Sequence, residues 1–125
     1  MSIPSTGAPN AAIYSFWDDL FVDASASVRS ELLGSVPNRR FVIEWRNVHV
    51  FGDTGRRLNF NIVLYENGQI LTQSRNLADD GRERGNSATL GIENATGTVA
   101  LQYSFNQPAL EPEPAVNSIR YRPPA

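Results

Sequence analysis

Short apolar alternations separated by turn residues constrain the fold of this chain more than any other feature. Between residues 58 and 64 every second side chain is strongly apolar, and a second such segment covers residues 69–75 after Asn67-Gly68. A period of two places the apolar side chains on one face of a β-strand. Because an Asn-Gly pair between two strands is typical of a type I′ turn, we predict a tight hairpin over residues 57–75.

Comparable segments recur along the chain and predict an all-β protein. Residues 40–51 form a long strand whose apolar phase slips near Arg46-Asn47, as a β-bulge would cause. Residues 28–33 are expected to pair with its start. Further strands are predicted at residues 12–22 (one or two strands around a bend), 88–92, 99–105 and 116–121. About eight short strands are typical of an antiparallel β-sandwich with a jelly-roll-like arrangement.

The length of the chain, 125 residues, suits one hydrophobic core, so we expect a single domain over residues 1–125. Residues 1–11 and 122–125 lie outside the predicted strands and are expected to be flexible. Residues 1–10 lack the basic and apolar regions of a signal peptide. No apolar run approaches the roughly 20 residues of a membrane helix, so we expect no membrane span.

The composition excludes several classes of function. The net charge is −2 at pH 7 and no basic stripe is visible, which argues against nucleic acid as a partner. The chain has no cysteine, so disulfides, thiolate catalysis and cysteine-ligated zinc are excluded. All 11 basic side chains are arginine, so no lysine can form a Schiff base.

Catalytic constellations are not evident, and we expect that the chain is not an enzyme. His49 is the only histidine, and it has the context of neither a Ser-His-Asp triad nor a zinc motif. On a strand it is expected to be a partly exposed sheet residue. Glu44 and Glu93 could serve as paired carboxylates of a glycosidase only if they face one another, and nothing in the sequence brings them together.

Two acidic clusters are candidate calcium sites, because carboxylate oxygens are ligands that calcium prefers. The first comprises Asp18, Asp19 and Asp23; the second comprises Asp79, Asp80 and Glu83. Neither has the spacing of an EF-hand, and Arg82 and Arg84 lie beside the second. Solvated turns or ion pairs are the alternative for both clusters. The first cluster is the stronger candidate, and no other cofactor is expected.

Aromatic side chains could pack in the core or bind sugar rings on the surface. Trp45 follows Phe41 and Ile43 in phase and is expected in the core. Neighbours on a strand face opposite sides, so either Phe16 or Trp17 must be less buried. We therefore keep Trp17 as a candidate ligand-binding residue.

Five segments of the chain carry a family resemblance. They are residues 12–20 (AIYSFWDDL), 40–48 (RFVIEWRNV), 60–68 (FNIVLYENG), 87–94 (SATLGIEN) and 101–106 (LQYSFN). With them, most of the chain resembles a β-sandwich accessory module of secreted multidomain actinobacterial proteins, in which it often accompanies a subtilisin-like protease. More remotely, the order Phe-Trp-x-Asp, Glu-Trp-x-Asn-Val, Val-Leu-x-x-x-Gly is similar to the nidogen-type extracellular domain.

The resemblance implies a non-catalytic, extracellular accessory or binding module. Its partners would be neighbouring domains of a parent protein or an extracellular polymer. A carbohydrate-binding module that uses surface aromatics is the alternative, and a small hydrolase is disfavoured for want of a catalytic constellation.

The family pattern also implies strands before residue 12 that this sequence does not show. A sandwich that lacks edge strands exposes unpaired N–H and C=O groups, which tend to pair with another chain. The sequence gives residues 40–51 and 13–22 as candidate edges, and a homodimer is the predicted outcome. Residues 1–10 or 116–121 could instead cover an edge within one chain.

Overall fold

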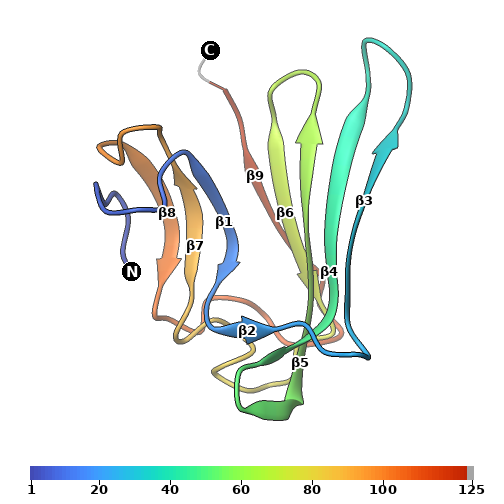
Figure 1. The fold of residues 1–125 in the computed structure, drawn as a ribbon, viewed down its shortest axis with the longest axis vertical. Helices are drawn as coiled ribbons and strands as arrows, with labels where there is room; N and C mark the ends of the chain where they lie inside the picture. The colour runs from blue at the N-terminus through green and yellow to red at the C-terminus, as the bar shows by residue number, and fades with distance from the viewer. Residues whose placement is uncertain (124–125) are drawn as a thin grey trace.

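The computed structural model describes residues 1–123 as an all-β fold of nine strands in two antiparallel sheets, which confirms the predicted β-sandwich (Figure 1). The described residues contain no helix, and so no helix that could cross a membrane.

Sheet A has three strands in the order β1-β7-β8. They are β1 (Ala12–Trp17), β7 (Thr89–Glu93) and β8 (Ala100–Phe105). The register of β1 against β7 shifts between Tyr14 and Trp17, where β1 carries one extra residue. This bulge lets both Ser15 and Phe16 face sheet B, where the Ser15 hydroxyl donates to the Asn61 carbonyl at 3.2 Å.

Sheet B has six strands, with β4 at the centre of its pairing. Strands β2 and β3 both pair with β4, and β5, β6 and β9 follow on the other side. The strands are β2 (Leu20–Phe21), β3 (Ser27–Leu33), β4 (Arg40–Val50), β5 (Asp53–Tyr65), β6 (Ile70–Arg75) and β9 (Asn117–Tyr121). The predicted bulge is confirmed: the β4–β5 register shifts between Trp45 and Val48, and Asn47 has φ 58°.

The β5–β6 hairpin is confirmed, but its predicted turn type is wrong. Only Gly68 of the Asn-Gly pair has a positive φ, 92°. Tyr65 N–H donates to the Gln69 carbonyl, so three residues form the loop instead of two. A three-residue loop needs a left-handed residue only at its last position, which the glycine supplies.

The buried core lies toward one end of the sandwich, and the sheets diverge toward the other (Figure 1). Its buried members come from both sheets and from the loops between them. They are Phe16, Val48, Leu58, Phe60, Leu77, Ala88, Leu90 and Leu110. Where the sheets diverge, apolar residues of the inner faces stay exposed, among them Leu101 at 58% and Tyr103 at 53%.

The predicted edge at residues 40–51 is wrong, because β4 pairs with β3 on one side and with β5 on the other. The edges of sheet B are β2 and β3 on one side and β9 on the other. Strand β1, within the other predicted edge, does lie at an edge of sheet A. Residues 117–121 pair with the edge of β6 that faces away from β5, so this segment covers an edge within one chain, which is one of the alternatives that the sequence left open.

Residues 1–10 lie against the outer face of sheet A. Ile3 is buried and its backbone N–H donates to the Gln102 side chain at 2.9 Å. Ser5 N–H donates to the Glu93 carboxylate at 2.7 Å. These contacts attach the segment to a sheet face and not to an edge. That residues 1–11 and 122–125 are flexible stays a prediction, and residues 124–125 lie outside the described part of the chain.

Candidate functional site

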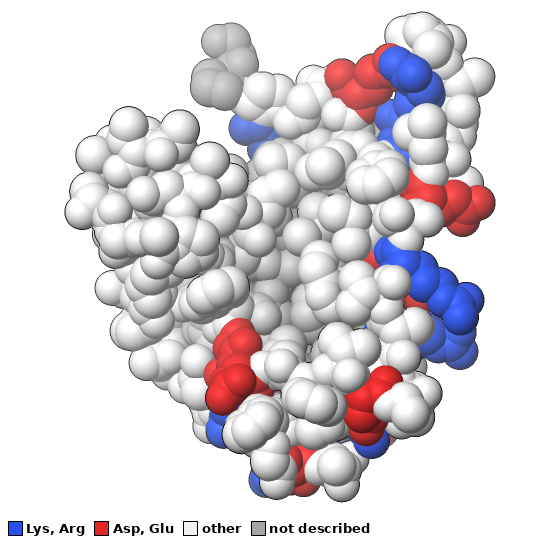
Figure 2. Space-filling model, in the orientation of Figure 1, with Lys and Arg blue, Asp and Glu red and all other residues white. Residues whose placement is uncertain are grey.

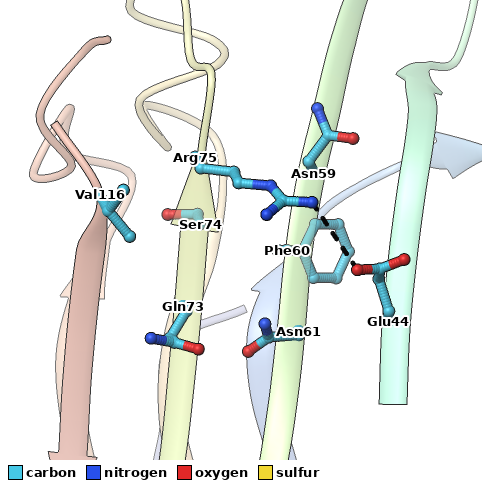
Figure 3. Close-up of a pocket in the computed structure, with 8 residues that line it drawn as sticks. All are labelled: Glu44, Asn59, Phe60, Asn61, Gln73, Ser74, Arg75 and Val116. Carbon is cyan, nitrogen blue, oxygen red and sulfur yellow. Dashed lines mark ion pairs between the residues drawn. The ribbon is translucent and has the colours of Figure 1, made fainter. Parts of the chain in front are cut away.

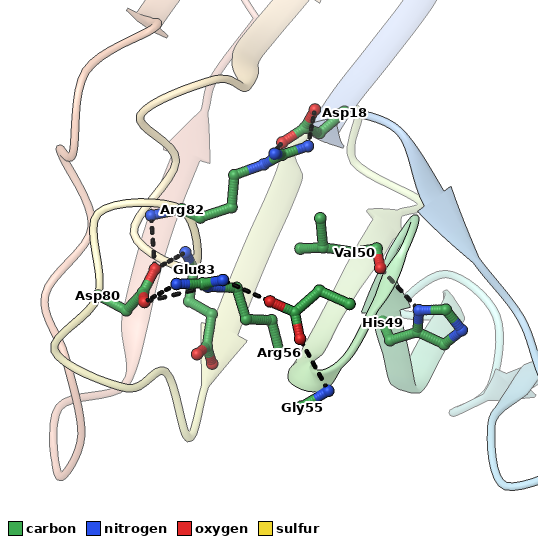
Figure 4. A network of polar contacts seen from close by, with 9 residues as sticks. Asp18, His49, Val50, Gly55, Arg56, Asp80, Arg82 and Glu83 are labelled. Atoms are coloured by element: carbon green, nitrogen blue, oxygen red, sulfur yellow. Dashed lines mark hydrogen bonds and ion pairs between the residues drawn. The ribbon is translucent and has the colours of Figure 1, made fainter.

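The first acidic cluster lies at the closed end of the sandwich, where the carboxylates of Asp18 and Asp23 take part in separate polar contacts. Asp18 accepts a hydrogen bond from the Arg82 guanidinium (Nε–Oδ2, 3.2 Å; Figure 4) and one from the Ser87 hydroxyl at 2.7 Å. Asp23 pairs with Arg57 (Nη2–Oδ2, 2.8 Å). Hydrogen bonds from Arg57 and from Ser25 hold the pKa of Asp23 well below its usual range.

The second cluster forms its own arginine pairs. Asp80 accepts from the Arg56 guanidinium at 2.8 Å and from Arg82 N–H at 2.8 Å, and Arg56 also contacts Asp53 (Figure 4). The Arg56 hydrogen bond lowers the pKa of Asp80. Glu83 is buried beside this network, and its Oε1 accepts from Ala78 N–H at 3.2 Å. Burial raises the pKa of Glu83.

These contacts correspond to the ion-pair alternative that the sequence left open. Within residues 1–123 no three acidic or histidine side chains form a group that could hold a metal ion. Calcium at Asp18, Asp19 and Asp23 would have to displace the guanidinium groups of Arg82 and Arg57. The calcium site therefore stays a prediction.

His49 is buried, so the expectation of a partly exposed histidine is wrong. Its Nδ1 lies 2.7 Å from the Val50 carbonyl oxygen (Figure 4). Its Nε2 lies 3.7 Å from the Asp23 carboxylate. The Phe21 ring covers it at a centroid distance of 5.4 Å. A general base must reach the proton that it removes, and the imidazole Nδ1 of His49 contacts a backbone carbonyl instead.

Glu44 and Glu93 lie on different sheets. Glu44 is on β4 and points to the outer face of sheet B, where Arg75 is its neighbour at 3.8 Å. Glu93 is on β7 and points to the outer face of sheet A, where it accepts from Ser5 N–H. The whole sandwich separates the two carboxylates, so they cannot act on one glycosidic bond.

Of the neighbours Phe16 and Trp17, Trp17 is the exposed one. Its side chain is 46% exposed and meets the Tyr14 ring edge-to-face at 5.6 Å. Phe16 is buried and stacks on Phe60 at 5.9 Å, so the predicted difference between the neighbours is confirmed. Trp45 is partly buried, packs against the core and stacks on the Phe60 ring at a centroid distance of 5.0 Å.

A shallow polar groove of about 140 Å³ crosses the outer face of sheet B. Asn59, Asn61 and Gln73 line it beside the Glu44–Arg75 pair (Figure 3). The Oδ1 atom of Asn61 is buried without a hydrogen-bond partner among the described residues. Sequence reasoning missed this groove, although the polar residues alternate with apolar ones along β5.

Sequence reasoning also missed an apolar cleft between the diverging sheets. One part, of about 480 Å³, lies between Ile70 of sheet B and Ile13, Ile92 and Leu101 of sheet A. A second part, of about 310 Å³, shares Ile13 and has Trp45 among its lining residues. Figure 2 shows the valley between the two lobes almost without charged side chains, which gather at its lower end and along the outer edge of sheet B.

The free edge of β1 borders this cleft. Asn94 N–H donates to the Val99 carbonyl at 2.9 Å, so the backbone of Asn94 faces the β8 side. Alternate residues face alternate sides of an antiparallel ladder, so Glu93 and Gly91 face β1, where their partners are Ala12 and Tyr14. The N–H and C=O groups of Ile13 therefore point away from β7, where no strand of residues 1–123 pairs with β1.

Comparison with known proteins gives one match. No curated protein and no solved structure matches the chain. A family model described as NIDO related matches residues 1–125. This match supports the remote similarity to the nidogen-type domain; the actinobacterial origin and the protease context stay predictions. Since the match spans the full sequence, the chain belongs to the NIDO-related family.

Proposed function

We propose that the chain is a non-catalytic extracellular module that binds an extended apolar segment of a neighbouring domain in the cleft between its sheets. The NIDO-related family, in general one of extracellular non-catalytic modules, supports the module role. The single observation that carries the binding role is the apolar cleft beside an unpaired strand edge.

Two properties of the cleft support a polypeptide as the occupant. Its walls are side chains such as Ile13, Ile70 and Leu101, which favour apolar groups by the area they remove from water. Its border along the free edge of β1 offers the backbone N–H and C=O groups of Ile13, which an added strand can pair with. A segment with apolar side chains at alternate positions would meet both requirements.

Peptide binding tests this proposal. The probes are an eight-residue peptide of alternating Val and Thr, and the same peptide N-methylated at alternate amides. We expect the unmodified peptide to bind by calorimetry and the methylated one to lose at least about tenfold in affinity, because it lacks strand donors. Ile70→Asp should abolish binding, whereas Val116→Asp, outside the cleft, should not. Equal binding of both peptides, or none, would reject the proposal.

A carbohydrate-binding role is the second candidate. It is supported by the exposed Trp17 and by the amide-lined groove with the unpartnered Asn61 Oδ1. Such side chains can stack on sugar rings and hydrogen-bond hydroxyl groups. A glycan array with the native chain, Trp17→Ala and Asn61→Ala would detect this role, and binding that both variants reduce would favour it.

A further inference from the structure

Strand β3 offers a free edge of sheet B with no element beyond it (Figure 1). It carries the sequence Ser-Val-Arg-Ser-Glu-Leu-Leu, of which every residue from Val28 to Leu32 is exposed. None of the ion pairs within residues 1–123 involves Arg29 or Glu31. The strand therefore presents unpaired backbone groups together with two unpaired, opposite charges.

The hydrogen-bond ladder decides which backbone groups are free. Glu66 N–H donates to the Arg39 carbonyl, so the backbone of Arg39 faces β5. By alternation, Arg40, Val42 and Glu44 face β3, where their partners are Leu33, Glu31 and Arg29. The backbone N–H and C=O groups of Val28, Ser30 and Leu32 consequently point away from the sheet.

We propose that β3 pairs with β3 of a second copy of this chain, antiparallel and about a two-fold axis at Ser30. In this register Ser30 lies opposite Ser30, and Val28 lies opposite Leu32 of the other copy. All three residues with free backbone groups then form hydrogen-bonded pairs. Two-fold symmetry is the commonest arrangement of homo-oligomers.

Charge selects this register over its neighbours. Arg29 of one copy lies opposite Glu31 of the other, twice, in non-hydrogen-bonded pairs whose Cα atoms are about 4.5 Å apart. A shift in one direction by one backbone repeat would place Arg29 opposite Arg29. A shift in the other direction would place Glu31 opposite Glu31. Opposite charges across a strand pair stabilise it, and like charges destabilise it.

The apolar side chains support the same pairing. Val28 and Leu32 point to the inner face of sheet B, in register with Trp45 and Phe41. Their exposed fractions are 47% and 59% in the single chain. The pairing brings Val28 of one copy beside Leu32 of the other, and it extends the apolar inner face across the two copies of sheet B. The structure thus replaces the edge at residues 40–51 with β3 as the strand that would form a homodimer.

Charge exchange tests this pairing by light scattering after size exclusion. For the native chain we expect a mass that rises with concentration from 13.8 kDa toward twice that value. Arg29→Glu and Glu31→Arg should each remain monomeric, because each places like charges opposite one another. The double variant R29E/E31R should dimerise again. An equimolar mixture of the two single variants should form a heterodimer, because opposite charges then meet.

Two control variants make the result decisive. Arg122→Glu makes the same change of net charge away from β3 and should dimerise as the native chain does. Ser30→Pro removes an N–H that faces the free edge, so it should abolish the dimer while circular dichroism shows an unchanged fold. A native chain that stays at 13.8 kDa up to about a millimolar would overturn the proposal. A dimer that neither charge reversal weakens would overturn it equally.

Discussion

At the scale of single residues, carboxylates of this protein act on its stability in opposite directions. The pKa of Glu66 is lowered to about 2 by hydrogen bonds from Arg39. A lowered pKa contributes stability above the ordinary pKa of the group, which is lost as the pH falls through the lowered value. The pKa of buried Glu83 is raised by desolvation. Glu83 therefore contributes to stability while it is protonated, below its ordinary pKa, and this contribution is lost as the pH rises through the raised pKa.

Glu83→Gln should therefore raise the unfolding midpoint at pH 7, by about 1 to 4 °C. The amide keeps an acceptor for Ala78 N–H without the buried charge. Thermal melts between pH 3 and pH 8 should show the gain shrinking toward acid pH. Glu66→Gln is the matched control: it should lower the midpoint at pH 7, with an effect that shrinks near pH 2. A lower midpoint for Glu83→Gln at pH 7 would contradict this assignment.

At the scale of elements, β5 connects the centre of sheet B to the core. It pairs with β4 and β6, and its inner residues Leu58 and Phe60 belong to the core that joins the sheets. By contrast β8 lies at an edge of sheet A, and its Leu101 faces the open cleft. A leucine on β5 is therefore expected to contribute more to the free energy of unfolding than a leucine on β8.

Leu58→Ala should lower the free energy of unfolding by about 2–5 kcal/mol, because it leaves a cavity at a fully buried position. Leu101→Ala makes the same chemical change at a 58% exposed position and should cost no more than about 0.5 kcal/mol. Urea denaturation measures both. Equal losses for the two variants would show that the cleft is closed in solution.

At the scale of the whole molecule, one core couples the two sheets. Phe16 of sheet A stacks on Phe60 of sheet B, and Leu77, Ala88 and Leu110 from the loops complete the cluster. A domain with a single shared core of this kind is expected to unfold cooperatively. The open end does not divide the molecule into independent parts, because the core at the closed end contacts both sheets.

The two tryptophans can test this coupling, since Trp17 lies in sheet A and Trp45 in sheet B. Trp45→Phe leaves a reporter for sheet A, and Trp17→Phe leaves a reporter for sheet B. In each variant the fluorescence and far-ultraviolet circular dichroism transitions in urea should have the same midpoint. Separate midpoints in either variant would show that the sheets unfold independently.

The sequence by itself determined the fold class and several local details. Period-two alternation predicted most of the strands, the β5–β6 hairpin and the bulge in β4, because each depends on side chains within a few positions. The greater exposure of one of the neighbours Phe16 and Trp17 followed from the same rule. The family resemblance added the relation to the nidogen-type domain, which the match over residues 1–125 supports.

Only the tertiary structure decided which strands meet and which faces remain uncovered. Periodicity does not encode partners distant in sequence, so it could not place β4 at the centre of sheet B or bury His49 beneath Phe21. The arginine pairs of Asp18 and Asp80 join residues 64 and 24 positions apart. The cleft lies where the two sheets diverge, and the edge of β3 is free because among the described strands it pairs only with β4. These are properties of the packed sheets, which no single strand determines.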